Sequence, residues 1–472
     1  MRRALLGLIL MAFAMTGAPA VAQPQLRLEP YAFRLRDGTD LAAERGRFLV
    51  REDRNDPRSR RIEIGFVRFR STAQQPGNPI VYLAGGPGGS GVFTARGPRQ
   101  PVFLALRAVA DVIMLDQRGT GFSNHIPACA APRRLDPAVV LTEAVLNTYY
   151  RETLDDCMTR WRGAGVATGG YTTEQSADDI DDLRRALGAR QIDLMGTSYG
   201  SHLALTTMRR HARSIGRVVM SSVEGMDQTV KLPAHVDAVY ARIGRAVGID
   251  LPAQMRRVHA RMDAAPFAFT VGGDAARSFR SDSFLIRRLA SGVASNPGGI
   301  PRLVGGYAAL DAGQTEPLAE ILWNAFYRDP LRMTGMPELM DIASGITDAR
   351  LALVRRQAPT SLLGLAVNYA MPQMRGAVPG LDMGDDFRRE VRSRLPVLLF
   401  EGDFDTRTPI EEQAVATAGL ANAQRIRFVN GGHDLFEAHP RVAEILTDFF
   451  SGRPVTVREL VLPQPSARPP AG

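Results

Sequence analysis

The 472-residue sequence has little cysteine and almost no lysine. The two cysteines, Cys129 and Cys157, cannot complete a zinc site by themselves, and no H-E-x-x-H pattern is present. Lys231 is the only lysine, and the arginines form no long run, so the net charge of +9 does not indicate nucleic-acid binding. With 45% hydrophobic and 23% charged residues, the composition excludes a disordered chain and a multi-span membrane protein.

Residues 1–22 have the pattern of a secretory signal peptide. Arg2 and Arg3 precede an apolar stretch at 4–15, which is too short to span a bilayer, and Ala-Val-Ala at 20–22 offers a cleavage site. We therefore expect an exported protein, periplasmic or secreted, with no membrane span after cleavage. An uncleaved membrane anchor is the alternative.

Export also bears on Cys129 and Cys157. In an oxidising compartment, a single pair of cysteines is expected to form one disulfide. The alternative is two free buried thiols.

Apolar runs of strand length alternate with helical patterns along much of the chain. This alternation predicts an α/β fold, with a mostly parallel sheet covered by helices on both faces. Two earlier runs, 46–52 and 61–69, also have strand character. The later predicted strands are 79–84, 112–115, 191–195, 217–221, 396–400 and 425–429, and the predicted helices are 103–109, 176–187, 201–211 and 440–450.

The alternation stops in the middle of the chain, where helices are joined by Gly/Pro loops without a convincing series of strands. We interpret 227–390 as a helical cap inserted between two parts of the core, 23–226 and 391–455. The tail at 456–472 is predicted to be disordered. The predicted cap helices are 236–247, 254–262, 318–327 and 337–357.

Residues 196–200, Gly-Thr-Ser-Tyr-Gly, match G-x-S-x-G between a predicted strand and a predicted helix. This context favours a nucleophile elbow, a sharp turn that exposes the hydroxyl of Ser198 at a helix N-terminus. The alternative is an ordinary strand-to-helix turn.

A serine hydroxyl needs a base, and His433 is the best placed of seven histidines. It follows the strand 425–429 and precedes the last helix, so its loop can reach over the sheet edge toward Ser198. His202 and His211 lie on the helix after the turn and are expected to pack or point away from it.

The acid that would orient His433 is predicted to be Asp405, which follows the strand 396–400. The chain order Ser198, Asp405, His433 is the order expected for a nucleophile elbow on this kind of sheet. The other candidates for this acid are Asp403, Glu401 and, more distantly, Glu224.

A glycine-rich loop at 85–91 follows the strand 79–84. The backbone N–H groups of Gly86 and Tyr199 are the predicted oxyanion hole, since glycine allows close approach of the backbone to a substrate.

The same loop, at 86–91, matches the dinucleotide fingerprint G-x-G-x-x-G, with Asp116 ending the next strand. We favour the hydrolase interpretation, because Pro87 lacks an N–H for a pyrophosphate and a dinucleotide site would leave the serine, aspartate and histidine unused.

These motifs together resemble the alpha/beta-hydrolase serine peptidases of the prolyl aminopeptidase and tripeptidyl aminopeptidase type. The resemblance covers roughly residues 79–450 apart from the cap, and it implies an alpha/beta-hydrolase fold and removal of residues from a free peptide N-terminus. Two positions depart from the pattern of the family. Ala84 stands where relatives often have a histidine, and the segment 340–344 lacks the cysteine that secreted relatives often carry there. The motifs that carry it are 85–89, 116–121, 171–173 with Asp178, 196–200, Asp405 with 408–409, and Gly432-His433.

We therefore expect a serine hydrolase that cleaves short peptides through an acyl-enzyme and needs neither a metal nor an organic cofactor. Glu224 is the candidate for binding the substrate ammonium. Glu316 and Glu320 are further candidates, but we interpret them as surface carboxylates on cap helices. A carboxylesterase with the same residues is the alternative, and a non-catalytic binding protein on a hydrolase scaffold is a further one. The preferred peptide and the oligomeric state stay open.

Overall fold

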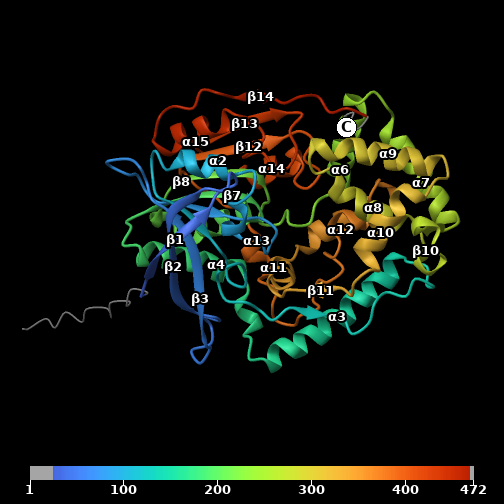
Figure 1. Ribbon diagram of the computed structural model, residues 1–472, viewed down its shortest axis with the longest axis horizontal. Helices are drawn as coiled ribbons and strands as arrows, with labels where there is room; N and C mark the ends of the chain where they lie inside the picture. Colours follow the sequence, from blue (N-terminus) through green and yellow to red (C-terminus); the bar gives the residue numbers. More distant parts are fainter. Residues whose placement is uncertain (1–24, 468–472) are drawn as a thin grey trace, which may run out of the picture.

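The computed structural model describes residues 25–467, so the predicted signal peptide lies outside the described residues. Within them the chain forms a ten-stranded sheet in which every neighbouring pair from β5 onward is parallel, which confirms the predicted sheet (Figure 1). An antiparallel extension, including the unpredicted β1, forms one edge. In sheet order the strands are β1 (Arg27–Arg34), β2 (Asp40–Arg51), β3 (Arg61–Phe69), β5 (Val112–Leu115), β4 (Ile80–Leu83), β7 (Ile192–Ser198), β8 (Ile215–Val223), β12 (Val397–Gly402), β13 (Ala423–Val429) and β14 (Glu459–Val461).

Alternate side chains of the central strands enter two different hydrophobic cores. Val81 and Leu83 share one core with α4 and α5, whereas Ile80 and Tyr82 share the other with α2 and α15. The central part of the sheet is therefore buried on both faces. The second face carries α1 (Gly91–Thr94), α2 (Gln100–Leu106) and α15 (Val442–Phe450); the first carries α3 (Glu143–Gly163), α4 (Thr173–Ala186), α5 (Tyr199–Arg210), α13 (Gly384–Arg388) and α14 (Ile410–Ala416).

Between β8 and β12 the chain forms a largely helical body with a hydrophobic core of its own, which we call the cap (Figure 1). The antiparallel pair β9 and β10 also lies here; it is not among the predicted elements, because four-residue strands show too little alternation to be recognised. The cap elements are α6 (Pro233–Ala246), α7 (Leu251–Ala264), β9 (Phe267–Thr270), β10 (Ser278–Ser281), α8 (Ser283–Val293), α9 (Ile300–Asp311) and α10 (Glu316–Phe326).

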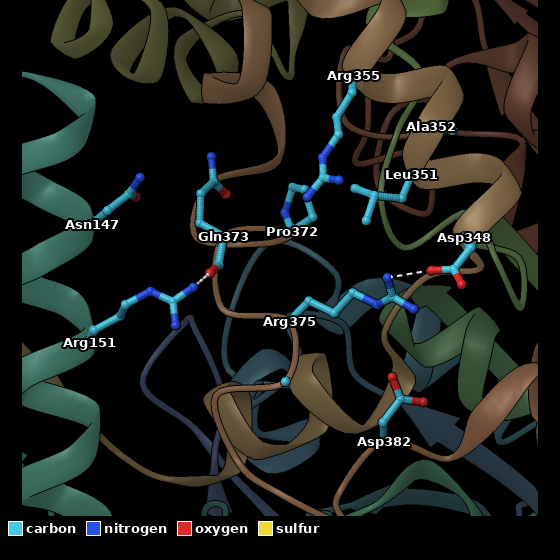
Figure 2. Close-up of a pocket in the computed structure, with 11 residues that line it drawn as sticks. Asn147, Arg151, Asp348, Leu351, Ala352, Arg355, Pro372, Gln373, Arg375 and Asp382 are labelled. Atoms are coloured by element: carbon cyan, nitrogen blue, oxygen red, sulfur yellow. Dashed lines mark hydrogen bonds and ion pairs between the residues drawn. The ribbon is translucent and has the colours of Figure 1, made fainter.

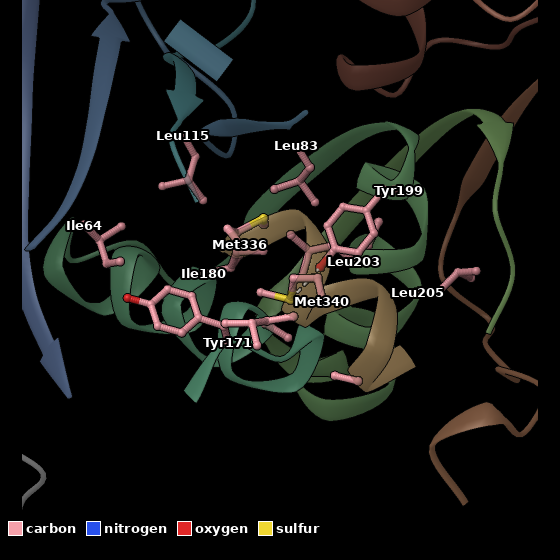
Figure 3. Packing of buried hydrophobic residues seen from close by; sticks show 14 of the residues in the cluster. Ile64, Leu83, Leu115, Tyr171, Ile180, Tyr199, Leu203, Leu205, Met336 and Met340 are labelled. Carbon is pink, nitrogen blue, oxygen red and sulfur yellow. Dashed lines mark hydrogen bonds between the residues drawn. The ribbon is translucent and has the colours of Figure 1, made fainter. Parts of the chain in front are cut away.

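The predicted helix 337–357 is two helices, α11 (Met336–Ser344) and α12 (Asp348–Gln357). Gly345, at φ +58°, ends the first, because few other residues adopt that backbone conformation. Met336 and Met340 of α11 pack against Tyr171 and Tyr199 in the core of the sheet (Figure 3). This part of the predicted cap therefore contacts the core of the sheet directly.

The C-terminal tail is partly ordered. Strand β14 pairs in parallel with β13, with Glu459 opposite Arg427 and Val461 opposite Val429. The prediction of disorder over 456–472 is wrong for this strand, whose three residues gain ladder hydrogen bonds from the sheet edge. Residues 468–472 lie outside the described residues.

The predicted disulfide between Cys129 and Cys157 is present. Cys129 lies on the short strand β6 (Cys129–Ala130), which pairs with β11 (Arg332–Met333), and Cys157 lies on α3. The bridge therefore ties α3 to β6, and β6 in turn pairs with β11, the strand that leads into α11. Asp156 is close to both sulfur atoms, but a disulfide offers no thiolate to a metal ion.

The loop after β5 contains Arg118, whose side chain is fully buried. It forms two hydrogen bonds with the carboxylate of Asp179 on α4, at 2.8 and 2.9 Å. It also donates to the carbonyl oxygens of Glu52 and Gly170 at 2.6 and 2.5 Å. The D-Q-R-G-T-G motif therefore joins the sheet to α4 and to the β2–β3 turn.

We expect Arg118→Ala to lower the free energy of unfolding by about 3 kcal/mol, since the buried Asp179 carboxylate would keep only Arg54 as a charged partner and two carbonyl oxygens would lose the Arg118 donor. Denaturant titration would measure this. Arg58→Ala is the control, because that side chain is 93% exposed. A loss as small as in the control would contradict a stabilising role for the network.

Candidate active site

Ser198 stands at the junction of β7 and α5, as the G-x-S-x-G pattern predicts. Its φ is 53° and its ψ −129°, a conformation that non-glycine residues rarely adopt. A Cβ at Gly200 would collide with the Leu83 carbonyl oxygen, and one at Gly196 with the Gly200 carbonyl oxygen. Both glycines are therefore needed for the turn to fit beside β4.

The hydroxyl of Ser198 is available for chemistry. Within residues 25–467 its Oγ makes no hydrogen bond, and the side chain is partly exposed. A Cβ at Gly85 would lie 3.0 Å from the Ser198 Cβ, so the glycine loop passes directly over the serine.

His433 and Asp405 are in direct contact. His433 Nδ1 lies 3.0 and 2.9 Å from the two carboxylate oxygens of Asp405. The carboxylate is fully buried and accepts three more hydrogen bonds, from the backbone N–H of Arg407 and from the N–H and hydroxyl of Thr408. Burial raises the pKa of Asp405, but the His433 imidazole and the Thr408 donors outweigh it, and the pKa lies below its usual value.

The two nearest competitors of Asp405 point elsewhere. Asp403 pairs with Arg427 at 3.1 Å, and Glu401 pairs with Arg425. Of the acids that follow β12, Asp405 is the one that meets the imidazole.

The His433 loop is anchored beside the Ser198 turn. Ser222 Oγ on β8 donates to the His433 carbonyl oxygen at 2.6 Å, and the next residue, Val223, is the register partner of Ser198. Neighbouring strands of the sheet therefore hold the serine and the histidine loop on the same edge. His202 and His211 are engaged elsewhere, with the Gly225 carbonyl oxygen and with Asp178.

Two backbone N–H groups flank the serine. Tyr199 is the first residue of α5, where N–H groups have no partner in the helix. Gly86 has φ +122°, which requires glycine, and its N–H makes no hydrogen bond within the described chain. The phenol of Tyr199 turns into the core, where its hydroxyl lies 3.3 Å from Met340 Sδ (Figure 3).

A small pocket, which we call the Glu224 pocket, begins at Gly86. Glu224 lines it, but Lys231 Nζ already donates to Glu224 Oε2 at 2.7 Å. Asp341 on α11 also lines it, and its carboxyl makes no hydrogen bond or ion pair within residues 25–467. The residues that line the pocket are Gly86, Glu224, Thr229, Val230, Lys231, Asp341, Val367, Asn368, Tyr369, Ala370, Met371 and Arg407.

Sequence reasoning missed Asp341. The one available signal is a carboxylate inside the apolar helix Met-Pro-Glu-Leu-Met-Asp-Ile-Ala-Ser. Glu316 and Glu320 are exposed on α10, in agreement with their interpretation as surface carboxylates.

Asp116, the acid of the dinucleotide alternative, is used within the chain. Its carboxylate accepts hydrogen bonds from the Ser90 hydroxyl at 2.6 Å and from the N–H groups of Val92 and Phe122 at 3.1 and 2.6 Å. These bonds fix the loop after β4 to the loop after β5. A ribose would have to compete with all three donors, which argues against a dinucleotide site.

A separate hollow of about 880 Å³ lies between α3, α12 and the loop around 372–382 (Figure 2). Its lining is largely polar; Arg375 pairs with Asp348 at 2.6 Å, and Arg151 donates to the Gln373 carbonyl oxygen. Neither Ser198 nor His433 lines it, so it is distinct from the candidate site.

A mostly parallel sheet with a strained serine between strand and helix, and an aspartate–histidine pair in the loops after β12 and β13, defines a protein of the alpha/beta hydrolase class. The family model described as "alpha/beta hydrolase fold" matches residues 78–440. Because this is more than half of the chain, the protein belongs to the alpha/beta hydrolase fold family, and the fold implied by the motifs is confirmed.

Curated relatives match a shorter region. The chain is 30% identical over 191 residues to the tripeptidyl aminopeptidase of Streptomyces lividans, which is 38% of this chain and 35% of that protein. It is 26% identical over 166 residues to the serine protease Hip1 of Mycobacterium tuberculosis, which is 34% of this chain and 31% of that protein. The matched region thus spans about a third of the length of these relatives.

Solved structures of the fold include a proline iminopeptidase from Mycobacterium smegmatis, 16% identical with a TM-score of 0.42. The match covers 83% of this chain and 95% of the proline iminopeptidase chain. An epoxide hydrolase from an endophytic Streptomyces is 17% identical, with a TM-score of 0.40 and coverage of 88% and 98%. Between residues 25 and 467, none of the helices has both the length and the apolar character needed to cross a bilayer.

Proposed function

We propose that this protein is an exported serine hydrolase that cleaves short peptides near their free N-terminus. The observation that carries this proposal is the Glu224 pocket. There the carboxyl of Asp341, which has no hydrogen-bond or ion-pair partner among residues 25–467, lies in the same pocket as Gly86 of the loop that covers Ser198. The similarity to a tripeptidyl aminopeptidase and to a serine protease supports peptide substrates.

In the proposed reaction, Ser198 Oγ attacks the scissile carbonyl and His433 accepts its proton, while Asp405 holds the imidazole and stabilises its charge. The N–H groups of Tyr199 and Gly86 bind the oxyanion. When the C–N bond breaks, His433 returns the proton to the leaving amine. Water then attacks the acyl-enzyme while His433 accepts its proton. The ester bond to Ser198 Oγ breaks, His433 returns the proton to that oxygen, and the N-terminal segment leaves with a free carboxyl group.

The free amine is recognised by charge. Glu224 and Asp341 bring two carboxyl groups into one pocket, and Lys231 engages only the first. A substrate ammonium would complete the pairing by binding Asp341, and an N-acylated peptide could not. This requirement distinguishes an aminopeptidase from a carboxylesterase with the same catalytic residues.

Three substrates test the proposal: an unblocked peptidyl arylamide, the same compound with an acetylated N-terminus, and a short acyl ester, with Ser198→Ala as the control. We expect cleavage of the unblocked amide to exceed that of the acetylated one by roughly 100-fold, the scale of a lost charge-assisted contact. Cleavage of the ester alone would make the protein a carboxylesterase. If Ser198→Ala kept full activity, the nucleophile would be another residue.

Ammonium binding should depend on pH. Burial, reinforced by the nearby Glu224 charge, raises the pKa of Asp341 to about 7, with Glu338, Lys231 and Arg407 as its other charged neighbours. Below that pH the carboxyl is neutral and cannot attract an ammonium, so binding must weaken as the pH falls.

Calorimetry on Ser198→Ala, which removes turnover, would measure this effect with an unblocked peptide. We expect its affinity to fall by up to about tenfold per pH unit below the pKa of Asp341. Adding Asp341→Asn should weaken binding at neutral pH and flatten this dependence. An acetylated peptide is the control, and an unchanged slope in the double variant would assign the titration to another group.

Export is supported by the Cys129–Cys157 disulfide, because such bridges persist mainly in oxidising compartments. Fractionation of cells that produce the full chain would test it: the disulfide-bonded protein is expected outside the cytoplasm. Recovery of a reduced protein in the cytoplasm would contradict export.

A further inference from the structure

Tyr369 separates two hollows of the molecule. On one side it lines the Glu224 pocket; on the other it lines a larger cavity of about 1160 Å³ formed mainly by α8, α9 and α10, which we call the cap cavity. The side chain is 7% exposed, and its hydroxyl has no hydrogen-bond partner among the described residues. A buried hydroxyl without a partner calls for an explanation, and a ligand group is one.

Arg288 on α8 lines the same cap cavity. Its one side-chain hydrogen bond is a long one, 3.3 Å from Nη1 to Ser291 Oγ, and within residues 25–467 no carboxylate lies within 4.0 Å of it. Its Cζ is 5.9 Å from the centre of the Tyr369 ring. Burial lowers the pKa of Arg288, because the charged form lacks an anionic partner.

The cap cavity also borders the proposed reaction centre. Ser295 and Asn296 both line it, and the Ser295 carbonyl oxygen accepts the His433 N–H at 2.8 Å. Asn296 Oδ1 accepts the N–H groups of His433 and Asp434 at 3.0 and 2.9 Å. The cavity therefore begins at the histidine loop, whereas the Glu224 pocket begins at the glycine loop.

The rest of the cap cavity is mostly apolar. Its lining includes Leu289, Val293, Leu303 and Ile321, with the guanidinium of Arg288 among them. A ligand that fits these surfaces has apolar side chains and one anionic group. The leaving part of a short peptide has both, since its free C-terminus is a carboxylate.

We propose that the cap cavity binds the leaving segment of the peptide and that Arg288 pairs with its C-terminal carboxylate, with the Tyr369 hydroxyl as a second donor. This inference rests on the proposed aminopeptidase function. Because Asp341 would bind one end of the substrate and Arg288 the other, the site would select peptides short enough for both ends to be enclosed. A guanidinium is suited to this role, since it presents paired donors to a carboxylate.

Two peptides of the same sequence, one ending in a free carboxylate and one in an amide, test the inference. We expect wild-type kcat/KM to be about tenfold higher for the carboxylate, which is the lower end of the range for one charge-assisted contact. Arg288→Gln should bring this ratio close to one, and Arg288→Lys should restore part of it. Arg302→Gln is the matched control, because Arg302 lines the same cavity but is exposed, and it should keep the ratio.

Equal kcat/KM values for the two peptides in the wild-type protein would overturn the inference, as would loss of the preference in Arg302→Gln with its retention in Arg288→Gln. Thermal melting of each variant shows whether it is folded, and Arg288→Lys keeps the test valid if the glutamine variant is not. An acetylated N-terminus separates this test from the proposed function. If acetylated and unblocked peptides react equally, the aminopeptidase proposal fails, whatever the C-terminus contributes.

Discussion

Replacing Ser198 by alanine is expected to lower kcat by roughly 10⁴- to 10⁶-fold, because the serine, histidine and aspartate of such sites act as a unit. Ser198 Oγ makes no hydrogen bond within residues 25–467, so its removal leaves no buried partner unsatisfied. The melting temperature should therefore change by no more than about 2 °C. Single-turnover assays with an unblocked peptidyl arylamide would measure the rate, and calorimetry the stability.

Ser201→Ala is the matched control for this experiment. Ser201 lies one turn along the same helix, and its hydroxyl is bonded to the Ser198 carbonyl oxygen and to the Glu224 N–H. Ser201→Ala should lower the melting temperature, and its kcat should fall far less than that of Ser198→Ala. A fluorophosphonate probe that labelled Ser198→Ala as fully as the wild-type protein would place the nucleophile elsewhere.

Replacing Asp405 by asparagine is expected to lower kcat by about 10⁴-fold, because an amide favours the wrong imidazole tautomer and cannot stabilise the imidazolium. The fully buried carboxylate contacts His433 Nδ1 with both oxygens, and none of the other acids after β12 does so. The pH–rate profile and kcat of Asp405→Asn would measure the effect.

Asp403→Asn is an unusually close control, since it makes the same chemical change two residues away. Asp403 pairs with Arg427 and contacts no atom of His433 by hydrogen bond or ion pair in the described chain. We expect its kcat to stay within about threefold of wild type, because Asp403 pairs with the half-exposed Arg427 and makes no contact with the imidazole. The reverse ranking of the two variants would assign the acid to Asp403.

Much of the fold follows from local pattern. Short apolar runs such as 112–115 and 396–400 became β5 and β12, because a strand buried on both faces needs continuous apolar residues. The strands that escaped prediction had no such pattern. β1 is mostly exposed at the sheet edge, and β9 has four residues, so pairing with neighbours rather than sequence preference holds them in the extended state.

The proposed catalytic residues were predictable because each lies next to a strand end with its own signal. Ser198 has flanking glycines that the turn requires, and His433 follows Asn-Gly-Gly after β13. The sequence leaves Asp405 and Asp403 open as the acid, since both follow β12 closely. The loop geometry favours Asp405, because Thr408 and Arg407 hold its carboxylate toward the imidazole.

The sequence by itself determined the class of the sheet, the strained serine turn and the order of the proposed catalytic residues, because these depend on residues close together in the chain. Only the tertiary structure decided what surrounds them. It joined Glu224 to Lys231, and it brought Asp341 on α11 into the same pocket. It also placed Arg288 beside the ring of Tyr369, where, among the described residues, the guanidinium has no carboxylate within 4.0 Å and the Tyr369 hydroxyl has no hydrogen-bond partner. Charge pairing of this kind depends on packing between distant segments, and no local pattern encodes it.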